Sequence, residues 1–373
     1  MAERWDVIVT GLGAMGSAAV RELARRGLRV LGLDRYAPPH ALGSTHGRTR
    51  IIREAYFEDP AYVPLVQRAD VLWTALEHQV GDRLFVRTGG LMIGPEHGVL
   101  VGGARASAQQ HRLPHELLTS AEVRRRFPAL APEPDAVGLY EPRAGVLFPE
   151  ACVRALLWCA ARDGAELRTG EPMLTWRVDA GVARVATAIG EYVADRLVLA
   201  LGPWLPEFLN GAATPLTVER QVQYWFKPRH HAERFAPRTL PIALWEVPGR
   251  LFYTLPDFGD GVKVAVHHDG EITDPQRVRR TVNEGEDANA RALMERYLPD
   301  AAGKLCDRAV CLYTNTSDGH FLIDRHPIHD EVVMVSACSG HGFKFATAIG
   351  EIVAKLCLGE EAEDLSLFRY RWH

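Results

Sequence analysis

Residues 5–34 read WDVIVTGLGAMGSAAVRELARRGLRVLGLD, and this stretch decides the fold of the chain. A short apolar run at residues 7–9 precedes three glycines, a helical pattern continues to Arg26, and a second apolar run ends at Asp34. This order predicts a strand, a tight turn, a helix and a second strand, the nucleotide-binding unit of a Rossmann-like domain. The alternative is a surface turn that binds nothing.

The three glycines of this stretch have the spacing Gly-x-Gly-x-x-Gly and are Gly11, Gly13 and Gly16. The first permits the tight turn, the second lets the backbone approach a pyrophosphate, and the third lets the helix pack on the strand. Asp34 follows Gly16 by eighteen residues, where a carboxylate accepts hydrogen bonds from an adenosine ribose. We therefore expect an adenine dinucleotide whose phosphates lie at the start of the helix.

The composition is that of a globular protein with two domains. The chain has 373 residues, of which 47% are hydrophobic and 24% charged, and its 43 basic and 47 acidic side chains give a net charge of -4. This balance argues against a nucleic-acid or membrane partner. No apolar run reaches the ~18 residues that span a bilayer and no signal peptide is apparent, so a cytoplasmic location is expected. The six cysteines form no C-x-x-C pair, and neither a metal site nor a disulfide framework is expected.

Apolar periodicity predicts the other elements. Helices are expected at residues 62–77, 121–127, 150–162, 286–297 and 346–358, and strands at 197–201, 222–226, 251–255, 262–267 and 332–337. The expected fold class is α/β, with a Rossmann-like nucleotide domain and an α+β substrate domain that has a mainly antiparallel sheet. We assign residues 1–84, 146–216 and 317–373 to the first domain, and 85–145 and 217–316 to the second.

One glycine fingerprint indicates one dinucleotide, which is either FAD or NAD. Near the end of the chain, Gly340 and Gly342 allow the backbone to pass close to a flat ring, and a helix begins near Phe345. The positive end of this helix, together with Lys344, would stabilise the negative charge of a reduced flavin, whereas neutral NADH needs it less. The loop therefore favours FAD, although an ordinary glycine turn before a helix would have the same pattern.

Three motifs resemble the monomeric sarcosine oxidase and N-methyltryptophan oxidase family of flavoproteins. They are GSTHGRTRIIR at 43–53, CLYT at 311–314 and SGHGFKF at 339–345, and the similarity runs from Trp5 to about Leu367. The resemblance implies an FAD-dependent, monomeric oxidase of secondary amino acids, whose reaction converts sarcosine, O2 and water into glycine, formaldehyde and H2O2. Bulkier N-methyl or cyclic imino acids, such as N-methyltryptophan, pipecolate and proline, are alternative substrates. An NAD-dependent amino-acid dehydrogenase and a non-catalytic nucleotide-sensing module are the alternatives from other classes.

The resemblance also implies roles for individual residues. Cys311 matches the cysteine that is joined to the 8α carbon of FAD, although a lone cysteine is more often an inert core thiol. Arg53 and Lys344 match the cations that hold the substrate carboxylate, for which the alternative is two surface cations. The remaining matches are His46 and Arg50 beside the flavin, Tyr253, His267 and Tyr313 at the substrate, and Ser44, Thr49, Gly340 and Gly342 at the cofactor.

Lys263 matches the lysine that activates oxygen above flavin N5. A fixed positive charge ~4 Å from nascent superoxide is worth ~4 kcal/mol at an effective dielectric of 20, close to a thousandfold in rate. A lysine exposed on an edge strand is the alternative. Two residues depart from the family pattern: Arg48 stands where an acidic residue is expected, and Glu54 where histidine is expected. We expect these departures to change the charge near the flavin or the mouth of the cavity.

Overall fold

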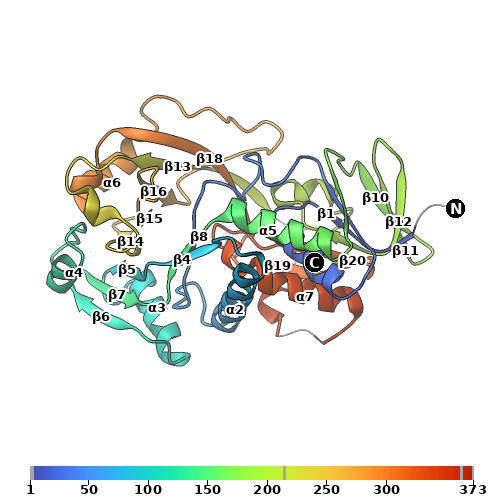
Figure 1. The fold of residues 1–373 in the computed structure, drawn as a ribbon, viewed down its shortest axis with the longest axis horizontal. Helices are drawn as coiled ribbons and strands as arrows, with labels where there is room; N and C mark the ends of the chain where they lie inside the picture. Colours follow the sequence, from blue (N-terminus) through green and yellow to red (C-terminus); the bar gives the residue numbers. More distant parts are fainter. Residues whose placement is uncertain (1–3, 213–215, 362–363, 372–373) are drawn as a thin grey trace.

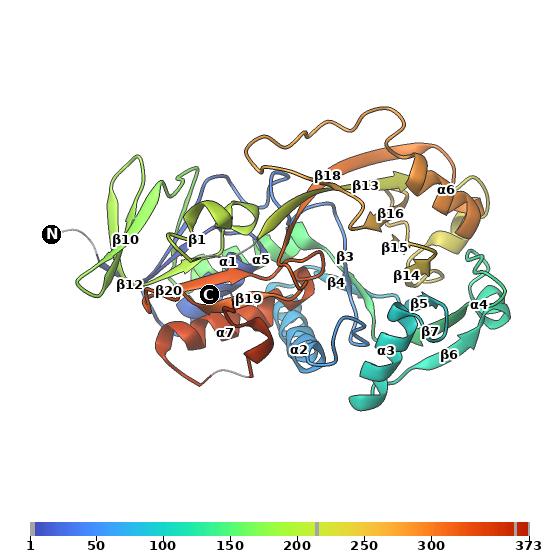
Figure 2. The same cartoon turned by 180° about the vertical axis from the view of Figure 1, so that it is seen from behind.

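A computed structural model describes residues 4–212, 216–361 and 364–371. The chain forms two lobes joined side by side, each built around one large sheet (Figure 1). The reverse view shows the same division, with the chain crossing between the lobes several times (Figure 2). The expected α/β fold class is confirmed.

The sheet of the first lobe has eight strands, with a parallel centre. In order across the sheet run β10, β11, β12, β1, β2 and β9, and β20 lies beside the end of β12 with β19 at its other side. Strands β1, β2, β9, β12 and β20 pair in parallel. The bounds are β1 Arg4–Thr10, β2 Val30–Asp34, β9 Glu166–Thr169, β10 Thr175–Asp179, β11 Val182–Ala186, β12 Glu191–Leu199, β19 Leu322–Arg325 and β20 Val332–Ser336.

Four helices pack in this lobe: α1 Ala14–Arg25, α2 Tyr62–Val80, α5 Pro149–Arg162 and α7 Ala346–Leu358. Helix α1 contacts both α5 and α7. The approach to α7 is close because Gly350 has no side chain: a Cβ there would lie 2.7 Å from the carbonyl oxygen of Ala18. The apolar faces of these helices and of β1 form one buried core beneath the glycine turn.

The sheet of the second lobe has nine strands and is antiparallel except where β5 pairs with β14. Its order is β17, β13, β16, β15, β14, β5, β7 and β6, and β18 also pairs with β13. The strands are β5 Gly90–Gly94, β6 Glu116–Thr119, β7 Val137–Glu141, β13 Thr217–Phe226, β14 Ile242–Val247, β15 Arg250–Leu255, β16 Val262–His267, β17 Glu271–Ile272 and β18 Leu305–Asn315. The helices here are α3 Val99–Gln110, α4 Ser120–Arg126 and α6 Ala288–Tyr297.

A small third sheet lies between the lobes: β3 (Arg50–Ile52) and β4 (Phe85–Arg87) both pair with β8 (Gly145–Leu147). Short 3-10 helices are η1 Gly202–Phe208, η2 Ala232–Phe235, η3 Pro299–Ala301, η4 Phe343–Phe345 and η5 Ser366–Phe368. The strand expected at 262–267 and the helix expected at 346–358 are confirmed with those bounds. Strand β3 was not predicted. Within the described ranges, no helix has the length and apolarity that crossing a membrane requires.

Candidate active site

One large cavity runs between the two lobes, and it brings together most of the predicted site residues. The first lobe contributes the glycine turn, the end of β2 and the loop at 335–344; the second contributes β15, β16 and β18, and the loop at 43–53 runs along one wall. The predicted residues that line it are Gly11, Gly13, Asp34, Ser44, Thr49, Arg50, Arg53, Tyr253, His267, Cys311, Tyr313, Gly340, Gly342 and Lys344. The other three, Gly16, His46 and Lys263, are not among the lining residues.

The glycine turn has the geometry of a pyrophosphate cradle. Gly11 has φ +84°, and a Cβ there would lie 2.4 Å from the carbonyl oxygen of Ala200. A Cβ on Gly16 would lie 1.7 Å from the oxygen of Gly11, so this glycine allows α1 to pack on the turn. The N-cap residue Gly13 has no side chain to cap α1; the Ala14 amide donates to Thr45 Oγ1 at 3.3 Å, and the next amides of the first turn can bind an anion. Asp34 accepts hydrogen bonds from the amides of Leu12 (2.6 Å) and Tyr36 (2.7 Å), and its carboxylate retains further acceptor sites.

One face of the nine-stranded sheet supplies the opposite wall. Directly opposed residues of antiparallel strands share a face, and the register pairs Trp225 with Lys263 and Gln221 with Cys311. Residues two apart on a strand also share a face. The same face therefore carries Gln223, Tyr253, Lys263, His267, Cys311 and Tyr313.

Lys263 is buried, and the edge-strand interpretation is wrong because β16 lies between β13 and β15. Its Nζ donates hydrogen bonds to the carbonyl oxygens of Gly47 (2.8 Å) and Thr49 (2.9 Å) and to Thr49 Oγ1 (3.3 Å). Burial, followed by the charge of Arg50, holds the pKa of Lys263 well below its ordinary value. The three oxygens oppose this by satisfying an ammonium group behind the cavity wall.

Cys311 lies at the cavity wall with 1% of its surface exposed. Its sulfur accepts a hydrogen bond from Arg50 Nη2 at 3.4 Å and lies 3.5 Å from the carbonyl oxygen of Ser44. Burial by itself raises the pKa of this thiol, but the cationic Arg50, with His46 and Lys263, outweighs it and brings the pKa down to about 7. The positive charge of Arg50 therefore favours the thiolate form of Cys311.

Arg53 and Lys344 are buried and line the cavity, so the interpretation as two surface cations is wrong. Arg53 binds both carboxylate oxygens of Glu58, at 2.8 and 2.7 Å, and its guanidinium lies over the rings of Tyr56 and Phe57. Lys344 Nζ donates to the carbonyl oxygen of His341 at 2.6 Å. Burial and then Arg53 lower the pKa of Lys344 to about 7.

The aromatic residues of the cavity wall are uncharged. His267 lies 3.3 Å from the hydroxyl of Tyr313, and burial, reinforced by His268, lowers its pKa to about 3. Burial also raises the pKa of Tyr253 to about 12. The backbone of Gly340 passes close to this group, because a Cβ there would lie 2.6 Å from the ring of His267. We infer a compact pocket floor with neutral hydrogen-bonding groups.

Sequence reasoning missed Glu58, Tyr56 and His341. Glu58 is the direct partner of Arg53, and the Tyr56 hydroxyl lies 2.6 Å from His341 Nδ1 and 3.4 Å from Lys344 Nζ. Glu58 follows Arg53 by five residues in a loop without periodicity, so no pattern in the sequence signals that the two side chains meet.

The expectation that Arg48 and Glu54 change the charge near the flavin or the cavity mouth stays a prediction, and the charge of Arg48 is among the causes that lower the pKa of Lys263. Neither residue lines the cavity. Arg48 is partly exposed, pairs with Asp307 and with Asp260 at 3.4 Å, and stacks over Trp225. Glu54 is buried against Arg143, with its Oε1 2.7 Å from the guanidinium. Carboxylates offset the charge of Arg48, and an arginine offsets that of Glu54.

The residues at the wall fit an adenine dinucleotide with a flavin ring. Beyond the first turn of α1 and Asp34, four buried side-chain atoms of the wall have no hydrogen-bond partner within the described part of the chain: Ser44 Oγ, Trp204 Nε1, Gln223 Oε1 and Ser336 Oγ. Buried polar atoms are normally paired, and a polar ligand along this wall would pair them. No cluster of metal-binding side chains occurs among residues 4–212, 216–361 and 364–371.

Comparisons with known proteins agree with this geometry. The profile of a family described as FAD dependent oxidoreductase matches residues 6–356. The chain is 45% identical to a monomeric sarcosine oxidase of Streptomyces avermitilis, covering 99% of this chain and 97% of the relative. It is 34% identical to an N-methyl-L-tryptophan oxidase of Yersinia pestis, covering 94% of each.

Solved structures show the same fold. NikD, an unusual amino acid oxidase essential for nikkomycin biosynthesis, superposes with a TM-score of 0.85 at 25% identity, covering 99% of this chain and 98% of NikD. A glycine oxidase of Geobacillus kaustophilus superposes with a TM-score of 0.84 at 21% identity over 99% of both chains. The resemblance that rested on three motifs is confirmed over almost the whole chain.

Proposed function

Because this chain belongs to the FAD dependent oxidoreductase family, we propose that it is an FAD-dependent oxidase of secondary amino acids, with sarcosine as the simplest substrate. The overall reaction converts an N-methyl amino acid, O2 and water into the amino acid, formaldehyde and H2O2. In this reaction, bound FAD supplies the acceptor for the two electrons of the substrate C–H bond.

The observation that carries the proposal is the pair of buried cations, Arg53 and Lys344, in the cavity that also contains the glycine turn. Glu58 offsets the charge of Arg53, so with Lys344 protonated the group keeps one net positive charge. A substrate carboxylate would balance this charge, and each charge-assisted hydrogen bond contributes roughly 1.5 to 3 kcal/mol. His267, Tyr253 and Tyr313 are neutral, so none of them places a negative charge beside the amine of the substrate. The substrate is thus oriented with its carboxylate at one end and its N-methyl group toward the cofactor.

We propose that Cys311 holds the cofactor covalently. Its lowered pKa gives the thiolate that such a bond requires, and its neighbour Arg50 stabilises that form. Protein precipitated with acid should keep the yellow flavin colour, whereas Cys311→Ala should release it. Colourless precipitate from the native protein would remove this assignment.

We propose that Lys263 assists the reaction with O2. Lys263 lies on the face of the sheet that carries the cavity wall, and three oxygens hold its Nζ behind that wall. In its protonated form it would supply a fixed positive charge without any reorganisation. Gly47 and Thr49 hold it through backbone carbonyls, which cannot move away as a flexible side chain could.

The apolar residues near Arg53 favour a second candidate substrate class. Leu100, Leu244 and Leu251 line the cavity, and Phe57 lies over the guanidinium at 4.7 Å. Such a wall suits bulkier N-methyl amino acids or cyclic imino acids such as pipecolate and proline. The test is H2O2 production across a panel of these acids with NAD as a control acceptor; absence of peroxide with every secondary amino acid would overturn the proposed function.

The division of the chain into residues 1–84, 146–216 and 317–373 against 85–145 and 217–316 is supported by the membership of the two large sheets. A monomeric state agrees with the names of the sarcosine oxidase relatives. The monomeric state and the cytoplasmic location stay predictions.

A further inference from the structure

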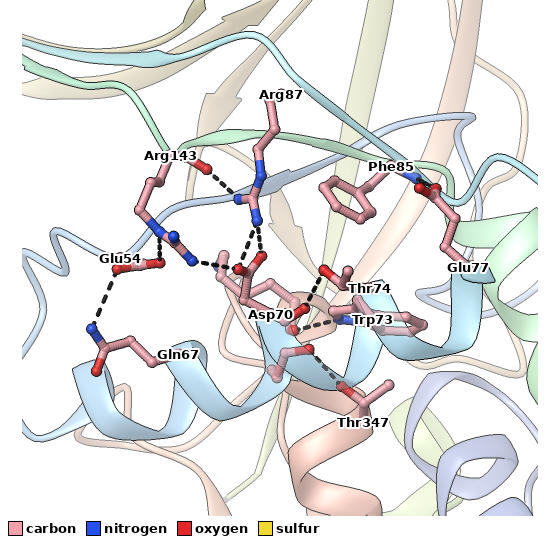
Figure 3. Close-up of polar contacts among 12 residues, drawn as sticks. Glu54, Gln67, Asp70, Trp73, Thr74, Glu77, Phe85, Arg87, Arg143 and Thr347 are labelled. Carbon is pink, nitrogen blue, oxygen red and sulfur yellow. Dashed lines mark hydrogen bonds and ion pairs between the residues drawn. The ribbon is translucent and has the colours of Figure 1, made fainter. Parts of the chain in front are cut away.

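Helix α2 lies against both segments that carry the buried cations, although neither Arg53 nor Lys344 belongs to this helix. One segment is the loop that follows β3, which carries Arg53; the other is η4, which carries Lys344. Figure 3 shows the polar contacts that connect the helix to both sides. The two cations come from positions 291 residues apart in the chain, so their separation must be set by something that touches both.

On the Arg53 side the connection is a chain of alternating charges. The side chain of Glu54, the residue after Arg53, accepts from Arg143 Nε at 2.7 Å. Arg143 Nη2 then donates to Asp70 on α2 at 2.8 Å, and Arg87 pairs with the same carboxylate and with the carbonyl oxygen of Arg143 (Figure 3). Glu54 and Asp70 are both at least 96% buried. Losing Arg143 would leave Glu54 without its ion-pair partner and would remove one of the two partners of Asp70.

The backbone of the same loop is also held. Both carboxylate oxygens of Glu141, at the end of β7, accept hydrogen bonds from the amides of Glu54 (2.7 Å) and Ala55 (2.9 Å). Arg53 Nη1 donates to the carbonyl oxygen of Ala55 at 3.0 Å. The direction of the Arg53 side chain therefore depends on where this loop is held.

On the Lys344 side the connection is direct. Trp73 Nε1, one turn along α2 from Asp70, donates to the carbonyl oxygen of Lys344 at 2.8 Å. The Trp73 ring also stacks on Phe343, with centroids 5.9 Å apart. Thr347 adds a hydrogen bond to the carbonyl oxygen of Ala69 on α2. Residues three apart on a helix are neighbours. Asp70 and Trp73 therefore connect to the Arg53 loop and to Lys344 from adjacent positions on α2.

We infer that α2 is the common support of the carboxylate receptor, and that Asp70, Arg143 and Trp73 are positioning residues that set the separation of Arg53 and Lys344. This inference rests on the proposed function. A bidentate receptor needs both cations in place at once, and a misplacement of about 1 Å can cost 10²-fold in rate. None of the three residues lines the cavity, so each acts through another group.

The test compares a carboxylate substrate with its amide, sarcosine against N-methylglycinamide, in the FAD-loaded enzyme. Arg143→Met removes the ion-pair link between Asp70 of α2 and Glu54, and it leaves the 3.4 Å contact of Gln67 with Glu54 in place. Trp73→Phe removes the hydrogen bond to Lys344 while keeping a ring. The matched control is Arg126→Met, since Arg126 is in the same segment of the second lobe and pairs with the exposed Glu116. The measured quantity is the ratio of kcat/KM for the acid to that for the amide.

We expect this ratio to fall about tenfold in Arg143→Met and in Trp73→Phe, mainly through KM of the acid, and to stay unchanged in Arg126→Met. Arg143→Lys should restore part of the ratio. A purely structural role would lower the thermal midpoint and both kcat/KM values together; an unchanged ratio in either variant would overturn the inference. If Arg143→Met does not fold, Glu54→Gln tests the same link. Wild-type protein that oxidises neither compound would instead refute the proposed function.

Discussion

Two parts of the cavity wall, the glycine turn and the pair Arg53 and Lys344, present groups that could bind charge in opposite ways. At the glycine turn the binding groups are backbone amides. Side chains are excluded there, because a Cβ on Gly16 would lie 1.7 Å from a backbone oxygen. At the second part of the wall the binding groups are the buried side chains of Arg53 and Lys344. Their hydrogen-bond partners are Glu58, Tyr56 and His341. A backbone site is specified by local sequence, whereas a site of buried charges needs partners from several elements. The two parts should therefore fail differently when they are mutated.

The largest effect is expected for Gly16→Ala. The added Cβ collides with the oxygen of Gly11 and must displace either the turn or α1, so the variant should retain little FAD or fail to fold. Flavin absorbance per mole of protein and far-UV circular dichroism measure this. Gly190→Ala is the control, because nothing lies within 4 Å of a Cβ there. Normal flavin content in Gly16→Ala would contradict the claim that the glycine turn excludes side chains.

Lys263→Met should slow the reaction of the reduced enzyme with O2 by up to about a thousandfold, the rate equivalent of ~4 kcal/mol. The carbonyl oxygens of Gly47 and Thr49 hold the Lys263 cation in place. The methionine of Lys263→Met carries no charge that could replace it. Stopped-flow measurements of enzyme reduction by substrate and of reoxidation by O2 separate the two half-reactions. Equal losses in both would remove the assigned role.

Arg53→Met should lower kcat/KM for an N-methyl amino acid roughly ten- to hundredfold, because one charge-assisted contact of 1.5 to 3 kcal/mol is lost. Flavin content should stay normal, since the hydrogen-bond partners of Arg53 are Ala55 and Glu58 and not residues of the glycine turn. Steady-state kinetics of peroxide release provide the measurement. Arg105→Met, which removes the exposed pair with Glu96, is the control and should match the native enzyme.

Carboxylate binding should weaken as pH rises through about 7. Only the protonated form of Lys344 carries the charge that binds an anion, and its pKa is lowered to about 7, so this contribution is present below that pH and is lost above it. Titration of the oxidised enzyme with acetate, followed by the flavin spectrum from pH 6 to 9, measures the dissociation constant, which should rise no more than about tenfold per pH unit for a single ionisation. Lys344→Arg should flatten the profile; a flat profile in the native protein would show that Lys344 is not the titrating group.

The smallest effect is expected for Arg48→Met. This side chain is 41% exposed and its pairs with Asp260 and Asp307 lie at the surface, so stability should change by at most about 1 kcal/mol. Activity should also stay within a factor of about two. Thermal unfolding and peroxide release with the native protein alongside provide the measurement. A large loss of activity would show that the charge of Arg48 reaches the cavity after all.

The elements that follow a local pattern were predicted well. The β1–α1–β2 unit, β16 and α7 lie where their apolar periodicity placed them, because a strand or helix of this length carries its own signal. Strand β3 has three residues and pairs only with β8, which lies about 95 residues later, so periodicity could not detect it. The motif residues Arg53 and Lys344 were identified by resemblance, whereas their partners Glu58 and Tyr56 were not.

The sequence by itself predicted a dinucleotide site at residues 11–16, because glycine spacing acts on the backbone within one turn. It also determined, through three motifs, the family to which the chain belongs. Only the tertiary structure decided that Lys263 is buried in the centre of a sheet and that Glu58 faces Arg53. It also decided that Glu54 is tied through Arg143 to α2. Burial and ion pairing depend on residues far apart in the chain, and no local pattern records which of them will meet.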